Sequence, residues 1–389
     1  MIIIEKPYIS DFLKETLLQH NLPVLETPIA TEMLGSGPYN LVKPEELIQQ
    51  AGQQEPLHIY TPSENAIQWI AENLHFTSLP GKIEQFKNKA VFRRLTRDLN
   101  PNFWFREFSY ESLQDTNPDQ LQFPLILKPS VGFFSMGVYR IEDAAQWHQT
   151  LQNLNRDLDT LKNLYPDKVV DASHFITEEI IEGEEFAVDA YFNSDGKPVM
   201  LGMMKHIFAS DQDVSDRVYF TSGKLIQKYY KPFMDFIQHI GKRIELTNFP
   251  LHIELRVDQA GNILPIEVNP LRFGGWCTSA DLMHKAYGFN PYLYFCKELE
   301  PKWDKLSYQN EDKIFSIVIL DRPAEINPQS IKSFDYDRVL ELFEKPLELR
   351  KADFKTFPQF GFLFTETHEN NFKELESILK QDLNEFITL

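Results

Sequence analysis

A segment in the second half of the chain constrains the fold more than any other. Residues 252–275 read HIELRVDQAGNILPIEVNPLRFGG, where two strand-like runs flank a turn at residues 259–261. Runs of alternating polar and apolar residues on either side of a short glycine-containing turn are typical of a β-hairpin. Because side chains alternate between the two faces of a strand, Glu254, Glu267 and Asn269 fall on polar faces. The segment therefore predicts a hairpin that brings three oxygen-bearing side chains together.

The polar face of this hairpin has the composition of a metal site. Carboxylate and amide oxygens are the hard ligands that hold Mg²⁺ against nucleotide phosphates. Acidic side chains on a paired face repel one another unless cations lie between them, and Arg256 is one such cation. The alternative is an amphipathic hairpin whose acids point to water. Directly after the hairpin, Arg272 and the pair Gly274-Gly275 offer a guanidinium and backbone amides, which suit a carboxylate or a phosphate.

The bulk composition excludes some classes of partner. The chain has 389 residues and a formal net charge of -18. A nucleic acid or an anionic membrane surface is not expected to bind it, because both require a basic face. The two cysteines, Cys277 and Cys296, are too few for a disulfide framework or a zinc pattern. The N-terminal apolar run is too short for a signal peptide, and no segment is long and apolar enough to span a membrane. These features predict a soluble protein of the cytoplasm.

The first 80 residues alternate strand-like and helix-like segments, which is typical of a small α/β domain. Residues 1–4 are apolar enough for a buried strand, and Ser10 can cap the helix that follows. Residues 61–64, TPSE, match a capping box with proline at the first helical position. Residues 84–99 are predicted to form one basic helix, and strands and helices continue to alternate toward the C-terminus.

Lys128 ends a strand-like run and precedes a loop over residues 130–137 that contains two glycines and two serines. Glycine allows backbone amides to approach phosphate oxygens, and serine adds hydroxyl donors. A strand rather than a helix follows the loop, which distinguishes it from a P-loop and favours a flap that closes over a triphosphate. The alternative is an ordinary hairpin turn with a surface lysine.

Three further segments are compatible with nucleotide binding, and for the first two an ordinary surface role is the alternative. Lys89 lies on the basic helix, and such a helix is usually a solvated face. Residues 178–185, EEIIEGEE, predict a strand, a break and a second strand. The backbone at this edge could pair with adenine and Glu185 could accept from ribose hydroxyls, whereas an exposed acidic hairpin is the alternative. Lys205 lies among apolar residues of a strand, where a lysine is expected to face a partner or a phosphate.

The order of these segments resembles that of the ATP-grasp superfamily of carboxylate–amine ligases. Lys89, Lys128 with its glycine loop, EEIIEGEEF, Lys205, HIEL and IEVNPLRFGG follow one another over residues 82–299. The resemblance implies a mixed α/β (α+β) protein built around an ATP-grasp core. It divides the chain into an N-terminal α/β domain that precedes the core, a small subdomain with the flap, a catalytic subdomain with the Mg²⁺ site, and a small C-terminal α+β extension. The boundaries are 1–80, 81–185, 186–310 and 311–389.

The resemblance also implies a role for each candidate site residue. ATP would be held by the lysines, the flap and the adenine edge, which comprise Lys89, Lys128, Ser130, Gly132, Ser135, Gly137, Glu178, Ile181, Glu185 and Lys205. Glu254, Glu267 and Asn269 would hold Mg²⁺, with Mn²⁺ as an alternative. Catalysis would fall to Lys128, Arg272, Gly274 and Gly275, with the arginine on a substrate carboxylate or an acylphosphate. Leu271 makes the spacing from Asn269 to Arg272 one residue longer than the pattern of amino-acid ligases.

The predicted function is that of an ATP-dependent carboxylate–amine ligase. A small carboxylic acid, with an amino acid as the leading candidate, is activated as an acylphosphate and joined to an amine, and ADP and phosphate are released. Arg217, Tyr219 and Trp276 are candidates for the substrate pocket, with surface or packing roles as the alternative. Two other functions stay open, namely a phosphotransferase on the same core and a nucleotide-binding module without turnover. The expected partners are a small carboxylate and an amine, and a homodimer is one alternative for the oligomeric state.

Overall fold

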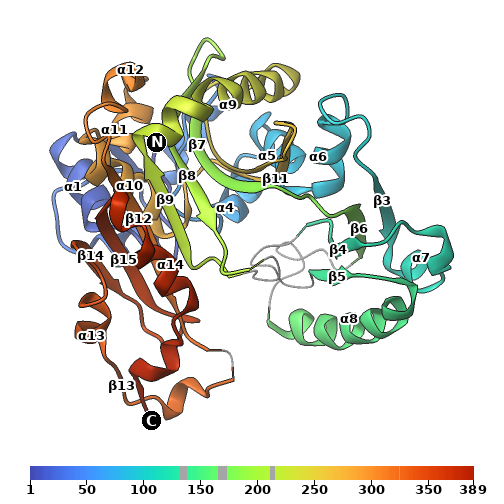
Figure 1. Ribbon diagram of the computed structural model, residues 1–389. Coiled ribbons are helices and arrows are strands. Elements are labelled where there is room, and N and C mark those ends of the chain that lie inside the picture. The colour runs from blue at the N-terminus through green and yellow to red at the C-terminus, as the bar shows by residue number, and fades with distance from the viewer. Residues whose placement is uncertain (132–137, 165–172, 211–214, 324) are drawn as a thin grey trace.

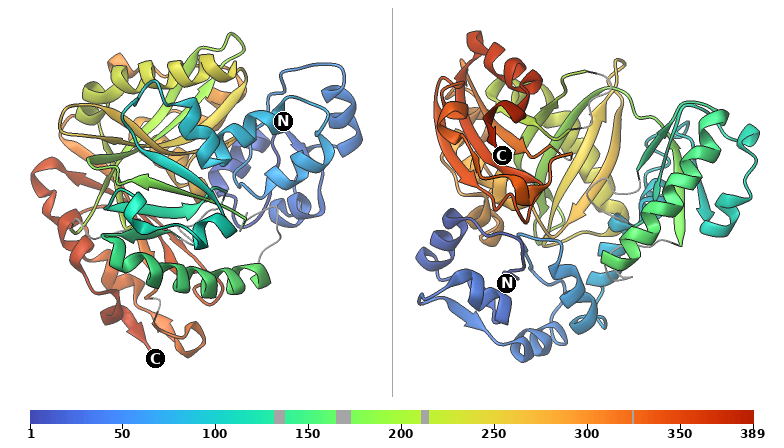
Figure 2. Two further views of the ribbon diagram at one scale, coloured as in Figure 1. Left: turned by 90° about the vertical axis from the view of Figure 1, so that its right-hand side faces the viewer. Right: turned by 90° about the horizontal axis from the view of Figure 1, so that it is seen from below.

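The computed structural model describes residues 1–131, 138–164, 173–210, 215–323 and 325–389. Within these residues the strands form an eight-stranded sheet, a four-stranded sheet and two two-stranded sheets. Figure 1 shows the four-stranded sheet set apart from the rest of the molecule, at the right of the view. Seen from below in Figure 2, that sheet and the C-terminal strands lie to opposite sides of the central strands, and the N-terminal part lies beneath them.

The N-terminal part is helical around a few short parallel strand pairings. Its elements are α1 (Asp11–Gln19), β1 (Pro23–Leu25), α2 (Pro28–Leu34), β2 (Asn40–Val42), α3 (Pro44–Ala51), α4 (Ala66–Asn73), α5 (Leu79–Lys87) and α6 (Lys89–Leu95). The predicted cap of α1 is confirmed, because the Ser10 side chain accepts from the amide of Leu13. The predicted first strand is reduced to Ile2, which forms parallel bridges with Val24 and Tyr60. Because these pairings are parallel, the loops that follow Ile2 and Tyr60 leave the paired segments at the same end.

Two helix predictions in this part are wrong. Helix α4 begins at Ala66, so Thr61 is not its cap and the carboxylate of Glu64 does not close a capping box. The amide of Thr61 instead donates to the carbonyl of Leu271 at 2.8 Å. The predicted basic helix over 84–99 is interrupted at Asn88, whose side chain accepts from the amide of Val91 and begins a new helix, α6.

The four-stranded sheet is antiparallel in the order β3-β6-β4-β5. Its strands are β3 (Phe105–Ser109), β4 (Leu125–Pro129), β5 (Tyr139–Ile141) and β6 (His174–Glu179), and α7 (Tyr110–Gln114), η1 (Pro118–Gln120) and α8 (Ala144–Leu164) complete it. Trp147 of α8 is fully buried in a core that also contains Phe108, Leu125 and Phe175. This packing explains why the sheet, although small, keeps a hydrophobic core of its own.

The eight-stranded sheet has the order β11-β10-β7-β8-β9-β12-β15-β14. Its strands are β7 (Glu184–Phe192), β8 (Pro198–Ile207), β9 (Val218–Ser222), β10 (Phe249–Val257), β11 (Ile263–Pro270), β12 (Lys313–Asp321), β14 (Pro346–Lys351) and β15 (Gln359–His368). Helix α9 (Gly223–Ile244), capped by Ser222, covers one face, where its Tyr229 and Phe233 contact Phe186. The C-terminal strands continue the same sheet, because β12 pairs with β9.

The remaining elements cover the sheet and close the chain. They are η2 (Gly275–Cys277), α10 (Thr278–Tyr287), α11 (Pro291–Cys296), α12 (Trp303–Leu306), η3 (Pro328–Ser330), β13 (Ser333–Phe334), α13 (Tyr336–Leu340), η4 (Glu369–Asn371), α14 (Lys373–Lys380), η5 (Leu383–Phe386) and β16 (Ile387–Thr388). Across the described ranges, no helix combines the length and the apolar character needed to cross a membrane.

Candidate functional site

The predicted hairpin exists as β10 and β11, with Gly261 in the turn at a φ of 86° that suits glycine. In its register Glu254 faces Glu267 and His252 faces Asn269. Residues directly opposite one another in a ladder point to the same face. The hairpin therefore brings Glu254, Glu267 and Asn269 together, as the alternation predicted. The Asn269 amide donates to Glu267 Oε1 at 3.2 Å, and Lys89 Nζ lies 3.9 Å from Glu267 Oε2.

The two glutamates ionise differently. Burial raises the pKa of Glu254, and the neighbouring charge of Glu267 raises it further. Burial acts in the same direction on Glu267, but the cationic Lys89 and Lys87 prevail and lower the pKa of Glu267. Burial also lowers the pKa of Lys89 to about 8. A half-buried pair of carboxylates in this position gains from a cation between them, which would allow both to ionise.

The donor set suits a magnesium ion that also touches phosphates. In the part of the chain that the structure describes, no cluster of three or more His, Cys, Asp and Glu side chains forms a complete protein cage for a metal. Two carboxylates and one amide are what Mg²⁺ uses when phosphates and water supply its other ligands. Glu254, Glu267 and Asn269 thus fit a nucleotide-bound ion better than a structural metal.

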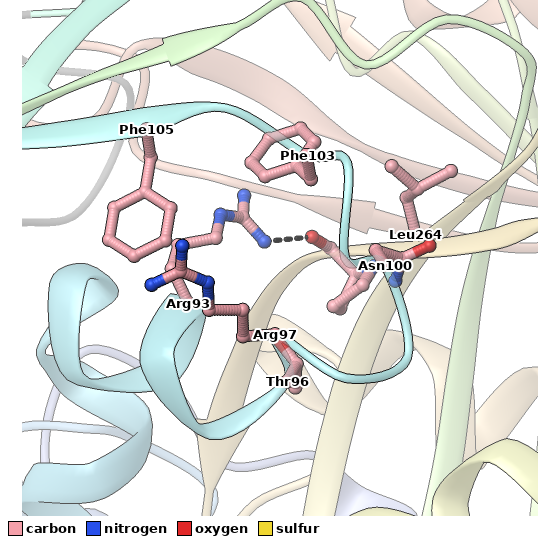
Figure 3. Close-up of a pocket in the computed structure, with 8 residues that line it drawn as sticks. Arg93, Thr96, Arg97, Asn100, Phe103, Phe105 and Leu264 are labelled. Atoms are coloured by element: carbon pink, nitrogen blue, oxygen red, sulfur yellow. Dashed lines mark hydrogen bonds between the residues drawn. The ribbon is translucent and has the colours of Figure 1, made fainter.

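Lys128 and Glu178 are joined in a buried ion pair, and Arg93 completes it. Arg93 donates to both carboxylate oxygens of Glu178, at 2.8 and 3.2 Å, and Lys128 donates to Glu178 Oε1. Burial would raise the pKa of Glu178, but Arg93 and Lys128 bring it down to about 2. Arg93 also donates to the carbonyls of Pro265 and Ile266 in β11. Figure 3 shows Arg93 beside Phe103 and Phe105, with a hydrogen bond to a carbonyl drawn as a dashed line.

The role predicted for Glu178 needs correction. Glu178 lies on β6, which is paired on both sides, and it faces Phe105 on one neighbouring strand and Ile126 on the other. The backbone of Glu178 is therefore not an open edge for adenine. Its side chain is committed to Arg93 and Lys128. Ile181 lies beyond β6 in the link to β7, where its carbonyl accepts from Arg256. The adenine contact therefore stays a prediction for Ile181 and not for Glu178.

Glu185 lies on the same face as the acid pair. It faces Arg256 across β10 and His206 across β8, and it accepts from Arg256 Nε and from His206 Nδ1, both at 2.9 Å. Burial would raise the pKa of Glu185, but these two partners lower it. The predicted ribose role of Glu185 thus stays geometrically consistent with a nucleotide whose phosphates reach Glu254.

The phosphate role predicted for Lys205 also needs correction. It faces Phe186 across the β7–β8 ladder, and Phe186 packs against Tyr229 and Phe233 of α9. Lys205 therefore points to the face that α9 covers, opposite to Glu185 and Glu254. There it pairs with Glu184, which also accepts from the Tyr229 hydroxyl at 2.8 Å. The neighbouring His206, which the prediction passed over, occupies the face expected of Lys205.

The roles predicted for Arg217 and Gly274 need correction as well. Arg217 donates to the carbonyls of Ile378 and Gln381, at 3.3 and 2.8 Å, and so binds the C-terminal end of α14 rather than a substrate. The amide of Gly274 is buried and donates to Asp189 Oδ1 at 3.1 Å and to Ser279 Oγ at 2.7 Å. It cannot serve as an exposed anion donor, whereas Gly275 is exposed.

Of the flap, Gly132, Ser135 and Gly137 lie outside the described residues. Ser130, which precedes them, is buried, and its carbonyl accepts from the amide of Lys89 at 2.8 Å. The start of the flap and the first residue of α6 are therefore held together, so Lys89 and Lys128 belong to one region as their order suggested.

The segment after β11 turns sharply. Leu271, Trp276 and Cys277 have φ values of 62°, 55° and 59°, which are uncommon for residues with a side chain. The extra residue Leu271 is thus accommodated by a left-handed conformation. The half-buried ring of Trp276 stacks on Tyr8, with ring centroids 5.4 Å apart, and its edge contacts Phe357. The proposed substrate contact of Trp276 stays a prediction, and Tyr219 stacks on His206 instead.

Sequence reasoning missed two carboxylates of the site. Asp189 accepts from His252 Nδ1 at 2.7 Å and holds the Gly274 amide and Ser279. Burial would lower the pKa of His252, but hydrogen bonds to Asp189 and Glu254 raise it to about 9. Glu64 binds Arg272, whose Nε and Nη2 donate to Glu64 Oε1 at 2.9 and 2.7 Å. The alternation of β7 could have shown that Asp189 shares a face with Glu185, whereas the local pattern around Glu64 indicated a helix cap.

Comparisons with known proteins bear on the fold of the chain. Residues 121–280 match the model of the ATP-grasp domain. A comparison with curated protein sequences finds no match. Among solved structures, the L-amino acid ligase from Bacillus licheniformis is 18% identical with a TM-score of 0.68, and the match covers 99% of this chain and 97% of the ligase.

Two other solved structures share the fold. N5-carboxyaminoimidazole ribonucleotide synthetase from Thermotoga maritima is 15% identical with a TM-score of 0.62, and covers 100% of this chain and 98% of its own. Biotin carboxylase from Campylobacter jejuni is 12% identical with a TM-score of 0.63, and covers 94% of this chain and 87% of its own. The expected ATP-grasp fold is thereby confirmed over almost the whole chain.

Proposed function

Since the chain has the ATP-grasp fold, we propose that it is an ATP- and Mg²⁺-dependent ligase that joins a small carboxylic acid, with an amino acid as the leading candidate, to an amine. The observation that carries the proposal is the facing pair Glu254 and Glu267, flanked by Lys89 and followed along the chain by Arg272. The likeness to an L-amino acid ligase supports the class of substrate. The division at residues 80, 185 and 310 belongs to the same proposal.

The nucleotide would lie over the polar face of β7 and β10. Glu185 would accept from the ribose hydroxyls, while Lys128 and Lys89 would neutralise phosphate oxygens. Glu254, Glu267 and Asn269 would hold Mg²⁺, which when bound offsets the negative charge of the phosphates. Binding of phosphates would draw Lys128 from Glu178, and Arg93 would remain as the partner that keeps this buried carboxylate ionised.

The reaction has two balanced steps. A carboxylate oxygen of the acid attacks the γ-phosphorus, the bond to the bridging oxygen breaks, and ADP leaves with an acylphosphate formed. The nitrogen of the amine then attacks the acyl carbon, loses a proton, and expels inorganic phosphate. Arg272 would hold the carboxylate and later the developing oxyanion, because a guanidinium donates in a fixed planar fork.

A phosphotransferase would stop after the first step and is the second candidate, since the same residues serve both reactions. A module that binds nucleotide without turnover is the third candidate, since the lysines and the acid pair could also serve binding alone. A screen of amino-acid and amine pairs separates the three functions. A ligase releases ADP and phosphate in equal amounts only when both substrates are present, a kinase releases ADP alone, and a binding module releases neither.

The metal site has its own test. We expect Glu267→Gln to lower turnover roughly 100-fold or more and to leave the melting temperature close to that of the wild type, because a lost ligand weakens the metal and not the fold. Glu107→Gln is a matched control, since that glutamate pairs with Arg94 at the surface. Wild-type turnover by Glu267→Gln would exclude this residue as a metal ligand.

A further inference from the structure

Glu64 reaches the site from the N-terminal part of the chain. Its loop is fixed at several points: the Thr61 amide donates to Leu271, and Ser63 Oγ and Asn65 Nδ2 both donate to the carbonyl of Lys6, at 2.5 and 2.8 Å. These bonds tie the loop to its neighbour and to the segment that carries Arg272. The carboxylate of Glu64 is therefore presented to Arg272 from a rigid position.

Arg272 is held along one edge. Nε and Nη2 donate to Glu64 Oε1, and Nη1 donates to the carbonyl of Phe273 at 2.9 Å. A guanidinium has five N–H donors. Three are used, so two remain without a partner among the described residues, one on each terminal nitrogen. A pair of donors on the terminal nitrogens is what binds a carboxylate or a phosphoryl group through two parallel hydrogen bonds.

The second oxygen of Glu64 holds a second cation, because Lys87 Nζ donates to Oε2. Burial would raise the pKa of Glu64, but Lys87 and Arg272 lower it to about 2. Lys87 also lies near enough to Glu267 to lower its pKa. Glu64 thus links the guanidinium to the cations beside the acid pair, and it keeps its charge over the physiological pH range.

We propose that Glu64 is the residue that positions Arg272, so that the two remaining donors of the guanidinium face the anionic group of the substrate. The inference rests on the proposed ligase function for the identity of that anion. Without Glu64 the arginine side chain keeps its charge but loses the partner that fixes its plane, and a plane that rotates stabilises a transition state poorly.

The kinetic test uses Glu64→Gln, Arg272→Lys and the double variant in the full chain, with ADP release measured for the best substrate pair of the screen. We expect Glu64→Gln to lower kcat roughly 10- to 100-fold, without a rise in KM for the carboxylate, because the site becomes more positive as its geometry loosens. In the Arg272→Lys background the same change should cost less than about 2-fold, since a lysine has no plane to fix. Losses that multiply in the double variant would refute the proposal, as would a rise in KM at unchanged kcat.

A substrate-free readout separates the inference from the proposed function. In protein labelled with ¹⁵N-arginine, the wild type should give two resolved Nη signals for Arg272, identified by their loss in Arg272→Lys, because a guanidinium held on one edge rotates slowly. Glu64→Gln should merge them, and Glu107→Gln should not. Unmerged signals in Glu64→Gln would overturn the positioning role. A wild type that turns over no substrate pair refutes the ligase proposal alone, since this spectrum needs no substrate.

Discussion

Arg93 of α6 joins β6 to β11 through one buried guanidinium. It is 4% exposed, and it is bound to the carboxylate of Glu178, which is 2% exposed, and to the carbonyls of Pro265 and Ile266. Its guanidinium also lies over the ring of Phe103, 4.9 Å from the centroid. In Arg93→Met the side chain still fills most of the space, but Glu178 keeps only Lys128 and two carbonyls lose their donor.

The expected loss of stability follows from these contacts. Removing one partner of a buried ion pair costs about 3–5 kcal/mol, because the other charge stays buried without compensation. For a chain of 389 residues, an unfolding entropy of about 2.1 cal/mol/K per residue converts this loss into a decrease in melting temperature of about 4–6 °C. Lys128 remains beside Glu178, which places the expectation toward the lower end of that range.

The neighbouring residue supplies the control. Arg94 lies on the same helix and pairs with Glu107, but their side chains are 51% and 45% exposed. Exposed pairs contribute about 0–1 kcal/mol, so Arg94→Met should lower the melting temperature by about 1 °C or less. The free energies of unfolding are measured by urea denaturation at pH 7, followed by circular dichroism. If Arg93→Met loses no more stability than Arg94→Met, the assignment of a buried ionic clamp to Arg93 is wrong.

Three further predictions concern the site and its surroundings. Gly274→Ala should lower activity strongly and Gly275→Ala should not, because a Cβ at Gly274 would lie 2.4 Å from Ser279 Oγ, whereas none of the described atoms lies within 4 Å of a Cβ at Gly275. Steady-state rates of the two variants test this prediction, and equal rates would contradict it. Lys205→Met should keep the wild-type affinity for MgADP in calorimetry, since Lys205 points to the face that α9 covers, whereas Lys128→Met should weaken that affinity at least roughly 10-fold. Equal losses of affinity in the two variants would place Lys205 in the nucleotide site after all. Burial, aided by the charged N-terminus, lowers the pKa of His58 to about 4, so the unfolded chain binds a proton there below pH 6.5 while the folded chain does not. Stability should therefore fall by up to about 3 kcal/mol as the pH decreases from 6.5 to 4, and His58→Phe should remove that part of the slope in urea titrations; an unchanged slope would show that His58 is not the cause.

The sequence by itself determined the elements whose signals are local. The alternation along residues 252–269 predicted that Glu254, Glu267 and Asn269 lie on polar faces of one hairpin, whereas the register that sets Glu254 opposite Glu267 also depends on an irregularity of the ladder between Glu254 and Leu255. Ser10 marked the start of α1, since a cap is made by residues within one turn of each other. The order of the lysines, the flap and the acids indicated the fold, because that order is a property of the chain.

Only the tertiary structure decided which partner each charged group takes. Glu64 and Arg272 are 208 residues apart, and the carboxylate that seemed to complete a local capping box binds that arginine instead. Lys205 shares a strand with His206, and the period of a strand says that the two face opposite ways but not which face α9 covers. Arg217 and the Gly274 amide were likewise taken by α14 and by Asp189. Buried charges and amides bind whichever partner the packed fold brings within reach, and the packing of distant segments is not written in any local pattern.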